Sequence, residues 1–437
     1  MNKSKYAFVG AGMVAGFAAA WMVFPSAQGA GNLTAYRQLD LFSDAFERVR
    51  ANYVRPVDDQ ELIGDAIEGM VSSLDPHSSY MDAKSFEDMQ VQTKGEFGGL
   101  GIEVTMEDGL VKVVSPIDDT PASKAGIKTG DFIAAIDGTP IQGMALNEAI
   151  DKMRGAIGTK VTLTILRTGE KKPFDVSLAR AVIKVDSVKW HREGDVGYIR
   201  LTAFNERTDS GLERAVKELK AQIGPGLKGY VIDMRNNPGG LLDQSIAVSD
   251  DLLSGSYEVV STRGRHPEDT QRYNARPGDI TDGKPLIVLV NGGTASASEI
   301  VAGALQDHKR ARILGMTSFG KGSVQTIIPL GEGGGALRLT TARYYTPSGH
   351  SIQATGIIPD IQVAQGQAED DPPKLVRPSE SDLPGHLAAE NNPRKAGDKI
   401  IRPAPGKKYD DFQLSYALDL LRGQTTVSAI TTASKAD

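Results

Sequence analysis

The sequence lacks cysteine altogether. This absence excludes disulfide bridges, thiolate nucleophiles, cysteine metal sites and a lipid anchor attached to cysteine. The chain also lacks an excess of one charge, because 49 basic and 55 acidic residues leave a net charge of −6 over 437 residues. Nucleic-acid surfaces need a clustered basic excess, so no nucleic-acid partner is expected.

Several familiar catalytic and nucleotide-binding motifs are missing as well. G-x-S-x-G and H-E-x-x-H are absent, and no catalytic motif contains any of the six histidines, at positions 77, 191, 266, 308, 350 and 386. The glycines at 10 and 12 resemble a dinucleotide-binding turn, but no acidic residue follows about 20 positions later. The segment from Gly315 to Lys321 resembles a phosphate-binding loop, but Gly322 replaces the Ser or Thr that binds magnesium. We therefore expect no cofactor and no metal ion.

The amino terminus has the pattern of an export signal. Lys3 and Lys5 precede an apolar stretch over residues 6–24, and Pro25 then opens a run of small residues. The apolar stretch is also long enough to remain as a membrane anchor. Residues 1–30 are therefore predicted to be a signal peptide or signal anchor. The mature chain is expected to be exported, either in the periplasm or anchored to the inner membrane facing it.

Composition and periodicity predict a soluble protein with two or three domains, since 40% of the residues are apolar and 24% are charged. The expected parts are a helical segment (31–95), a small sheet-and-helix domain (96–180), a larger domain in which strands and helices alternate (181–364), a flexible linker (365–409) and a terminal helix (410–437). In the larger domain we expect strands at 196–201, 229–234 and 286–290, and helices at 209–222, 241–253 and 298–306. The predicted fold class is α/β, with a mixed-sheet core and helical segments at both ends.

Two serines at one strand-to-helix junction are candidate nucleophiles. Ser296 and Ser298 lie where free backbone N–H groups of a helix can bind a developing anion. Ser296 with Glu299 also forms the pattern of a helix capping box, which is a purely structural explanation. The spacing alone does not separate the two serines.

Lys321 is the candidate base, because a lysine can accept a proton from serine when burial lowers its pKa. Its neighbours Gly320 and Gly322 would allow the backbone to pack closely around the amine. Gln325 follows in a predicted strand over 323–330, within reach of that amine. A solvated turn lysine and an exposed strand amide are the alternatives.

Gly239 and Gly240 lie in a turn between a strand and a helix, where their N–H groups are free to donate. A sterically required turn explains these glycines equally well.

Five motifs together resemble the carboxy-terminal processing peptidases, also called tail-specific proteases. They are Gly98-Gly-Leu-Gly-Ile102, the turn from Arg235 to Leu241, Thr294 to Glu299, Gly320-Lys-Gly-Ser-Val-Gln325, and Tyr344-Tyr-Thr-Pro-Ser-Gly349. The likeness runs from about residue 36 to 363. The separation of 25 residues between serine and lysine fits that family, and it selects Ser296 over Ser298.

The resemblance implies a serine endopeptidase in which Ser296 attacks, Lys321 takes its proton and Gln325 orients the amine. The amides of Ala297 and of Gly239 or Gly240 would hold the oxyanion. Residues 96–180 would form an inserted PDZ domain.

In this PDZ domain, the loop Gly99, Leu100, Gly101 and Ile102 would bind the carboxylate of a substrate tail. Arg154 would have a regulatory role, contacting the protease core when a peptide docks. The expected partners are proteins or peptides with exposed carboxy-terminal tails and further copies of the chain. The resemblance leaves room for an activating adaptor protein, and the amino terminus leaves membrane association open.

Two other functions fit parts of the same sequence. The chain would be an exported PDZ scaffold if its catalytic residues were misaligned. It would be an acyl transferase or amidase if the same serine and lysine acted on small substrates, although a PDZ domain favours peptide tails.

Overall fold

The computed structural model describes residues 28–107, 109–117, 119–331, 333–366, 379–390, 400–404 and 406–425. The predicted signal segment, residues 1–30, lies outside this part of the chain except for its last three residues. Over the described ranges, no helix is both long and apolar enough to cross a membrane. By its internal contacts the chain divides into two units, one ending at Ala66 and the other beginning at Ile67.

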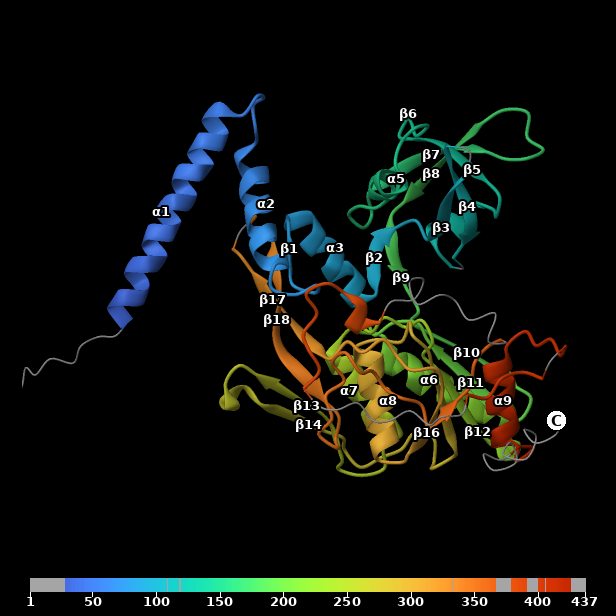
Figure 1. Cartoon of the computed structure of the whole chain (residues 1–437). Helices are drawn as coiled ribbons and strands as arrows, with labels where there is room; N and C mark the ends of the chain where they lie inside the picture. The colour runs from blue at the N-terminus through green and yellow to red at the C-terminus, as the bar shows by residue number, and fades with distance from the viewer. Residues whose placement is uncertain are drawn as a thin grey trace, which may run out of the picture. The chain divides into compact units, whose positions relative to one another are not determined.

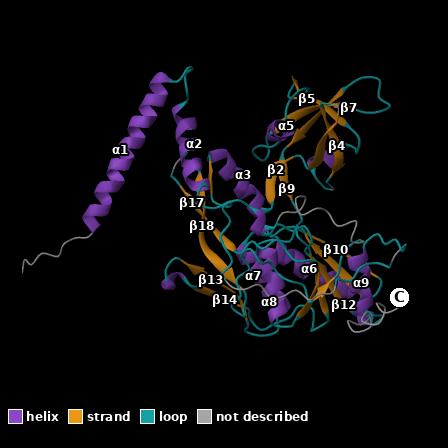
Figure 2. Ribbon diagram, viewed as in Figure 1, coloured by secondary structure: helices purple, strands orange, loops and turns teal. Residues whose placement is uncertain are grey.

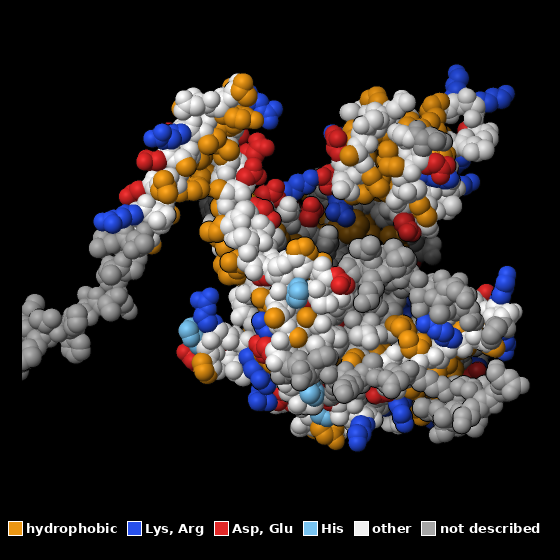
Figure 3. Space-filling model, in the orientation of Figure 1, with side chains coloured by type: hydrophobic (Ala, Val, Ile, Leu, Met, Phe, Trp, Pro, Cys, Tyr) orange, Lys and Arg blue, Asp and Glu red, His pale blue; other side chains and the backbone are white. Residues whose placement is uncertain are grey.

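The first unit contains helix α1 (Gln28–Asn52) and the start of helix α2 (Asp59–Ser72). Apolar side chains remain exposed along α1, among them Tyr36, Leu39 and Phe42 (Figure 3). Among the described residues of this unit, these apolar side chains are left exposed, and an isolated helix gains little from exposed apolar residues.

The core of the second unit is a six-stranded sheet with helices on both faces (Figures 1 and 2). Its order is β10-β11-β12-β15-β16-β19, and only the β10–β11 pair is antiparallel. The strands span Val188–Glu193 (β10), Val196–Leu201 (β11), Gly229–Asp233 (β12), Leu286–Val290 (β15), Ala311–Gly315 (β16) and Ile361–Gln362 (β19). The helices are α6 (Thr208–Ile223), α7 (Leu242–Leu252), α8 (Ala297–Asp307) and α9 (Phe412–Leu421).

Alternate residues of these strands face opposite layers, which explains their continuous apolar sequences. Ile232 and Val288 pack in one core with α6, α7 and α8. Val231 and Leu289 pack in a second core with Phe412 and other residues of α9. Within the segment predicted as a terminal helix (410–437), α9 is thus part of the core of the larger domain, because its apolar face covers one side of the central sheet.

A second, antiparallel sheet lies beside this core, with the order β1-β18-β13-β14 and β17 paired to β18. Its strands are β1 (Ser79–Met81), β13 (Glu258–Gly264), β14 (Gln271–Asn274), β17 (Ser323–Pro329) and β18 (Ala336–Tyr345). Through β1, the segment that follows α2 is hydrogen-bonded to β18. This pairing brings residues near position 77 to the sheet that also carries Gln325.

Residues 96–180 form a separate small sheet, β3-β4-β5-β7-β8, with its own apolar core and the helix α5 (Leu146–Met153). The strands are β3 (Ile102–Glu107), β4 (Leu110–Pro116), β5 (Phe132–Ile136), β7 (Lys160–Leu166) and β8 (Phe174–Ala179). Short elements complete it: α4 (Pro121–Lys124) and β6 (Thr139–Pro140). It is joined to the rest by α3 (Ala83–Lys94) and by the pair β2 (Glu96–Gly99) and β9 (Ala181–Lys184).

The range 365–409, predicted as a flexible linker, contains packed residues where the structure describes it. A turn of 3-10 helix, η5 (Glu380–Asp382), places Glu380 in a fully buried position. Ile401 pairs with Val363 as an isolated bridge. The linker prediction does not hold for these residues, because composition averages over a segment and does not reveal a single buried side chain.

Candidate active site

Ser296 lies at the amino terminus of α8 with a backbone conformation that is rare for serine. Its φ is 55° and its ψ is −116°. Non-glycine residues adopt such angles only where the surroundings enforce them, and they cluster at functional sites. The residue is 8% exposed, and its side chain interacts with the hydroxyl of Tyr344. Ser298 is fully buried and its hydroxyl donates to the Asn237 carbonyl at 3.1 Å, so only Ser296 is available at the surface of the site.

Glu299 holds the backbone of Ser296 beside that of Lys321. Its Oε2 accepts hydrogen bonds from the Ser296 nitrogen at 2.7 Å and the Lys321 nitrogen at 2.9 Å. Its Oε1 accepts from the Gly320 nitrogen at 2.7 Å and from the Ser318 hydroxyl. Because one oxygen serves both Ser296 and Lys321, their nitrogens lie within two hydrogen-bond lengths of each other.

The carboxyl of Glu299 is fully buried, and burial raises its pKa to about 7 even though its four donors favour the ionised form.

The Lys321 amine is in a desolvated position. Burial lowers its pKa, and the positive charge of Arg338 adds to this effect, while Glu380, Glu299 and Asp75 oppose it. Gly322 packs directly on the Gln353 backbone, leaving no room for a side chain there. Among the described residues, no hydrogen bond joins the Lys321 amine to the side chain of Ser296 or Gln325.

Gln325 lies in β17, and its amide donates to the Ser323 hydroxyl at 2.9 Å and the Thr340 hydroxyl at 3.2 Å. The Thr340 hydroxyl in turn donates to Asp75 at 3.1 Å. Asp75 also accepts from the Ser78 hydroxyl at 2.7 Å. The loop before β1 therefore supports the side chain of Gln325.

The turn with the two predicted oxyanion glycines packs against Ser296 and Ala297. Gly239 has a φ of 99°, and a Cβ there would lie 2.9 Å from the Ala297 nitrogen. The Gly239 N–H donates to the side chain of Asn237 at 2.9 Å, whereas no acceptor within the described ranges is recorded for the N–H groups of Gly240 and Ala297. Asn237 is fully buried, and its carbonyl also accepts from the Ala295 nitrogen at 3.0 Å.

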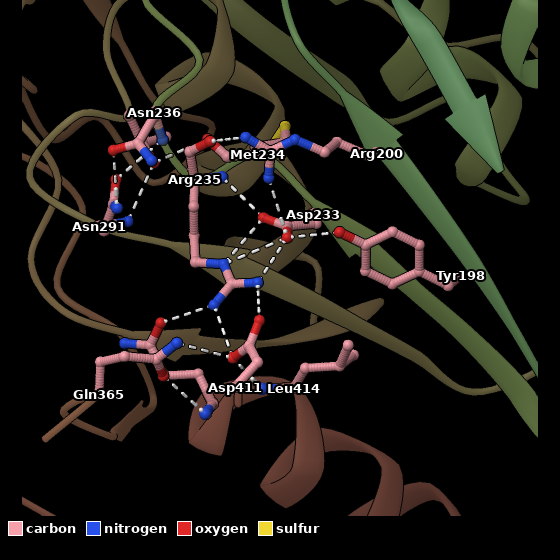
Figure 4. Close-up of polar contacts among 12 residues, drawn as sticks. Tyr198, Arg200, Asp233, Met234, Arg235, Asn236, Asn291, Gln365, Asp411 and Leu414 are labelled. Carbon is pink, nitrogen blue, oxygen red and sulfur yellow. Dashed lines mark hydrogen bonds and ion pairs between the residues drawn. The ribbon is translucent and has the colours of Figure 1, made fainter. Parts of the chain in front are cut away.

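A buried charge cluster anchors the start of the same turn. Figure 4 shows Arg235 between Asp233, at the end of β12, and Asp411, at the start of α9. The Arg235 guanidinium is 2.6 Å from a carboxylate oxygen of each aspartate. On the other side of the turn, the Asn236 nitrogen donates to Asn291 at 2.9 Å. The turn is therefore held from two sides, by Asp411 at the start of α9 and by Asn291 after β15.

The predicted tail-binding loop borders a groove of the small sheet. Gly99, Leu100, Gly101 and Ile102 line this groove together with Ile150, Met153 and Arg154 of α5 and its end, and with Phe97 and Val104. In the described part of the chain, no acceptor is recorded for the N–H groups of Leu100 and Gly101. Two free N–H groups above an apolar groove suit a peptide carboxylate.

Arg154 connects this groove to α3. Its guanidinium lies 4.7 Å from the ring centre of Phe97 and 3.6 Å from the carboxylate of Asp88. In this structure Arg154 contacts α3 and β2, and its contact with the larger domain when a peptide docks stays a prediction.

Sequence reasoning missed four polar residues at this site: Asp75, His77, Thr340 and Glu380. The Tyr344 hydroxyl was also missed, although its motif was noted. No local periodicity marks these residues, since each acts across a long sequence separation; His77 and Glu380, for example, are 303 residues apart and 2.8 Å from each other.

Comparison with known proteins identifies the family. A model of peptidase family S41 matches residues 195–363, a PDZ-domain model matches 98–178, and a model of the activating protease CtpB N-terminal domain matches 20–85. A carboxy-terminal-processing protease of Bartonella bacilliformis is 59% identical over 396 residues, covering 90% of each chain. The chain belongs to the carboxy-terminal-processing proteases of family S41.

Two further similar proteins are more distant. The carboxy-terminal processing protease CtpA of Bacillus subtilis is 36% identical over 331 residues, covering 75% of this chain and 70% of its own. Among solved structures, the photosystem II D1 C-terminal processing protease is 31% identical, covers 76% of this chain and 91% of its own, and superposes with a TM-score of 0.43. The S41 protein is thus a serine peptidase with a PDZ domain, as the sequence resemblance predicted.

Proposed function

We propose that this S41 protein cleaves exported proteins with a Ser296–Lys321–Gln325 catalytic set and recognises their carboxy-terminal tails through its PDZ domain. The observation that carries the proposal is the Glu299 oxygen shared by the Ser296 and Lys321 nitrogens, at 2.7 and 2.9 Å. It brings a strained serine and a desolvated lysine to one place without any histidine motif.

In the proposed reaction, the Ser296 Oγ attacks the scissile carbonyl carbon while its proton passes to the neutral Lys321 amine. The oxyanion is held by the N–H of Ala297 and by that of Gly239 or Gly240; Gly240 is favoured because the Gly239 N–H already donates to Asn237. The C–N bond then breaks, and Lys321 gives its proton to the leaving amine. Water, deprotonated by the same lysine, hydrolyses the acyl-enzyme and restores Ser296.

This chemistry needs a small rearrangement. The Ser296 side chain now interacts with Tyr344, and Gln325 donates to Ser323 and Thr340. We infer that substrate binding turns the Lys321 amine toward Ser296 and Gln325, with tail binding at Leu100 and Gly101 promoting the change through Arg154.

The test is cleavage of casein and of a tail peptide by purified variants. Ser296→Ala and Lys321→Ala should lose activity, and Lys321→Arg should be as inactive, because a guanidinium does not lose its proton near neutral pH. Ser298→Ala is the matched control and should remain active, since the Ser298 hydroxyl only donates to a backbone carbonyl. Equal cleavage by wild type and Ser296→Ala would instead favour a scaffold, and turnover by Lys321→Arg would reject lysine as the base.

Export, self-association and membrane attachment belong to the same proposal. The exposed apolar residues of α1 suit contacts between copies, and sedimentation of the purified chain measures this. Fractionation of cells into periplasm and membrane tests the location.

A further inference from the structure

Glu380 is a fully buried carboxylate in a segment that sequence composition marks as a polar linker. It begins the turn η5 and lies outside residues 195–363, which match the S41 family. A carboxylate is rarely buried completely unless it is paired, so its partners indicate why it is there.

The partners of Glu380 bracket Lys321 on both sides. The Glu380 nitrogen donates to the Phe319 carbonyl at 3.0 Å, two residues before the lysine. The Glu380 Oε1 accepts from the Gln353 amide at 2.8 Å, and the Gln353 Oε1 accepts from the Gly322 nitrogen at 3.0 Å, one residue after it. Glu380 therefore holds the loop of the base directly on one side and through Gln353 on the other.

The second oxygen of Glu380 reaches the amino-terminal part of the protease. The Glu380 Oε2 lies 2.8 Å from the His77 Nε2. His77 is in the same loop as Asp75, which supports Thr340 and, through it, Gln325. One carboxylate thus joins the loop of the base to the loop that supports the predicted orienting amide.

The negative charge of Glu380 also acts on the Lys321 amine. Burial opposes its ionisation, but hydrogen bonds from His77 and Gln353 outweigh this and hold the pKa of Glu380 below its ordinary value. The charged groups acting on Lys321 are Arg338 from β18, Glu299 from α8, Asp75 from the loop before β1, and Glu380. Glu380 is the member of this set that comes from the carboxy-terminal segment.

We propose that Glu380 is a positioning residue of the active site, which fixes the Lys321 loop through its hydrogen bonds and whose negative charge acts on the Lys321 amine. This inference rests on the proposed function of Lys321. It assigns the segment after the S41 domain a part in the catalytic centre, where sequence composition predicts only a connection.

Two variants separate the two roles. Glu380→Ala removes the clamp, so kcat should fall roughly 10- to 100-fold with little change in KM, as expected when a reacting group is displaced. Glu380→Gln keeps the size and a hydrogen-bond acceptor but removes the charge. The Lys321 amine should then lose its proton at lower pH, which moves the acidic limb of the kcat/KM profile to lower pH.

The titration of the Lys321 amine is also measured independently of activity, by NMR of proteins with labelled lysine side chains. The signal of Lys321 is assigned by its absence in Lys321→Arg. Glu390→Gln is the matched control, because Glu390 lies in the same segment but binds Arg343 and Tyr345. Glu390→Gln should leave kcat, the pH profile of kcat/KM and the NMR titration of the Lys321 amine unchanged. If Glu380→Ala does not fold, the NMR titration of the Lys321 amine in Glu380→Gln tests the inference by itself.

An unmoved amine titration in Glu380→Gln, or a wild-type kcat in folded Glu380→Ala, would overturn this inference alone. Activity that survives Lys321→Ala would overturn the proposed function instead, and the NMR titration would still report whether Glu380 acts on the amine.

Discussion

At the scale of single residues, the helix-cap and nucleophile interpretations of Ser296 do not exclude each other. The Glu299 carboxylate accepts a hydrogen bond from the Ser296 nitrogen, as the third helical residue of a capping box does. The same oxygen accepts from Lys321, so the cap also fixes the base. A capping box usually makes contacts only within one helix turn. Here its Glu299 also binds Lys321, which is 22 residues further along the chain.

The desolvated Lys321 amine should make the protein less stable than it would be with an apolar residue at that position. Burial lowers the pKa of Lys321 from its usual 10.5. The folded state therefore binds fewer protons than the unfolded state between the lowered pKa and 10.5, and stability rises with pH in that window. Lys321→Met, of similar length and uncharged, should be inactive yet more stable at neutral pH by roughly 0.5–2 kcal/mol.

This gain should shrink as the pH approaches about 10.5, where both states of the wild type lose the charge. Urea unfolding at a series of pH values measures it. Lys217→Met, at an exposed position of α6, is the control and should show no such dependence. If the Lys321→Met variant has wild-type stability at every pH, the amine is not desolvated.

At the scale of elements, helix α9 supports the turn that contains Gly239 and Gly240, the predicted oxyanion glycines. Its first residues hold Arg235 through Asp411 and Gln413, at 2.6 and 3.0 Å. The cluster lies directly before Gly239 and Gly240 in the chain. Loss of the packing of α9 would therefore displace the Arg235 guanidinium and, with it, the turn that contains Gly239 and Gly240.

Asp411→Asn should weaken both stability and catalysis. Arg235 would lose one of two carboxylate partners while remaining buried, which should cost about 2–4 kcal/mol in the free energy of unfolding. Burial opposes ionisation of Asp411, but Arg235 and the Leu414 nitrogen lower its pKa, so its stabilising effect is present above pH 3.8 and disappears as the pH falls through the lowered pKa. Urea unfolding and kcat measure the two effects. Asp410→Asn, next to it and exposed, should change neither; equal effects of the two variants would remove the proposed support.

The regular elements could be predicted closely, because their apolar periodicity is local. The strands expected at 196–201 and 286–290 are β11 and β15, and the helix expected at 209–222 is α6. The resemblance to the family, which its motifs and their spacing carry, predicted Ser296, Lys321 and Gln325 as the catalytic set. The Arg235–Asp411 pair spans 176 residues, and the His77–Glu380 pair spans 303. Such polar pairs leave no periodic pattern, so only the folded chain reveals them.

At the scale of the whole molecule, an ion pair and hydrogen bonds connect the groove of the PDZ domain to the protease core through α3. Arg154 lies at the groove and contacts Asp88 of α3 at 3.6 Å. At the end of α3, the Thr93 carbonyl accepts from the Glu206 nitrogen at 3.1 Å, and the Gly95 carbonyl accepts from the Val185 nitrogen at 2.9 Å. We propose that a peptide in the groove acts on the core by displacing the Arg154 guanidinium from Asp88, without contacting the core itself.

Arg154→Ala should lower the stimulation of casein cleavage by a saturating tail peptide, because it removes both the Asp88 contact and the packing on Phe97. Peptide affinity is measured separately by fluorescence anisotropy, so that a loss of binding is distinguished from a loss of coupling. Lys152→Ala, at an exposed position of the same helix, is the matched control and should retain full stimulation. If Arg154→Ala binds the peptide and is stimulated as strongly as wild type, the signal does not pass through this arginine, and the hydrogen-bonded pair of β2 with β9, which also joins this domain to the core, becomes the alternative route.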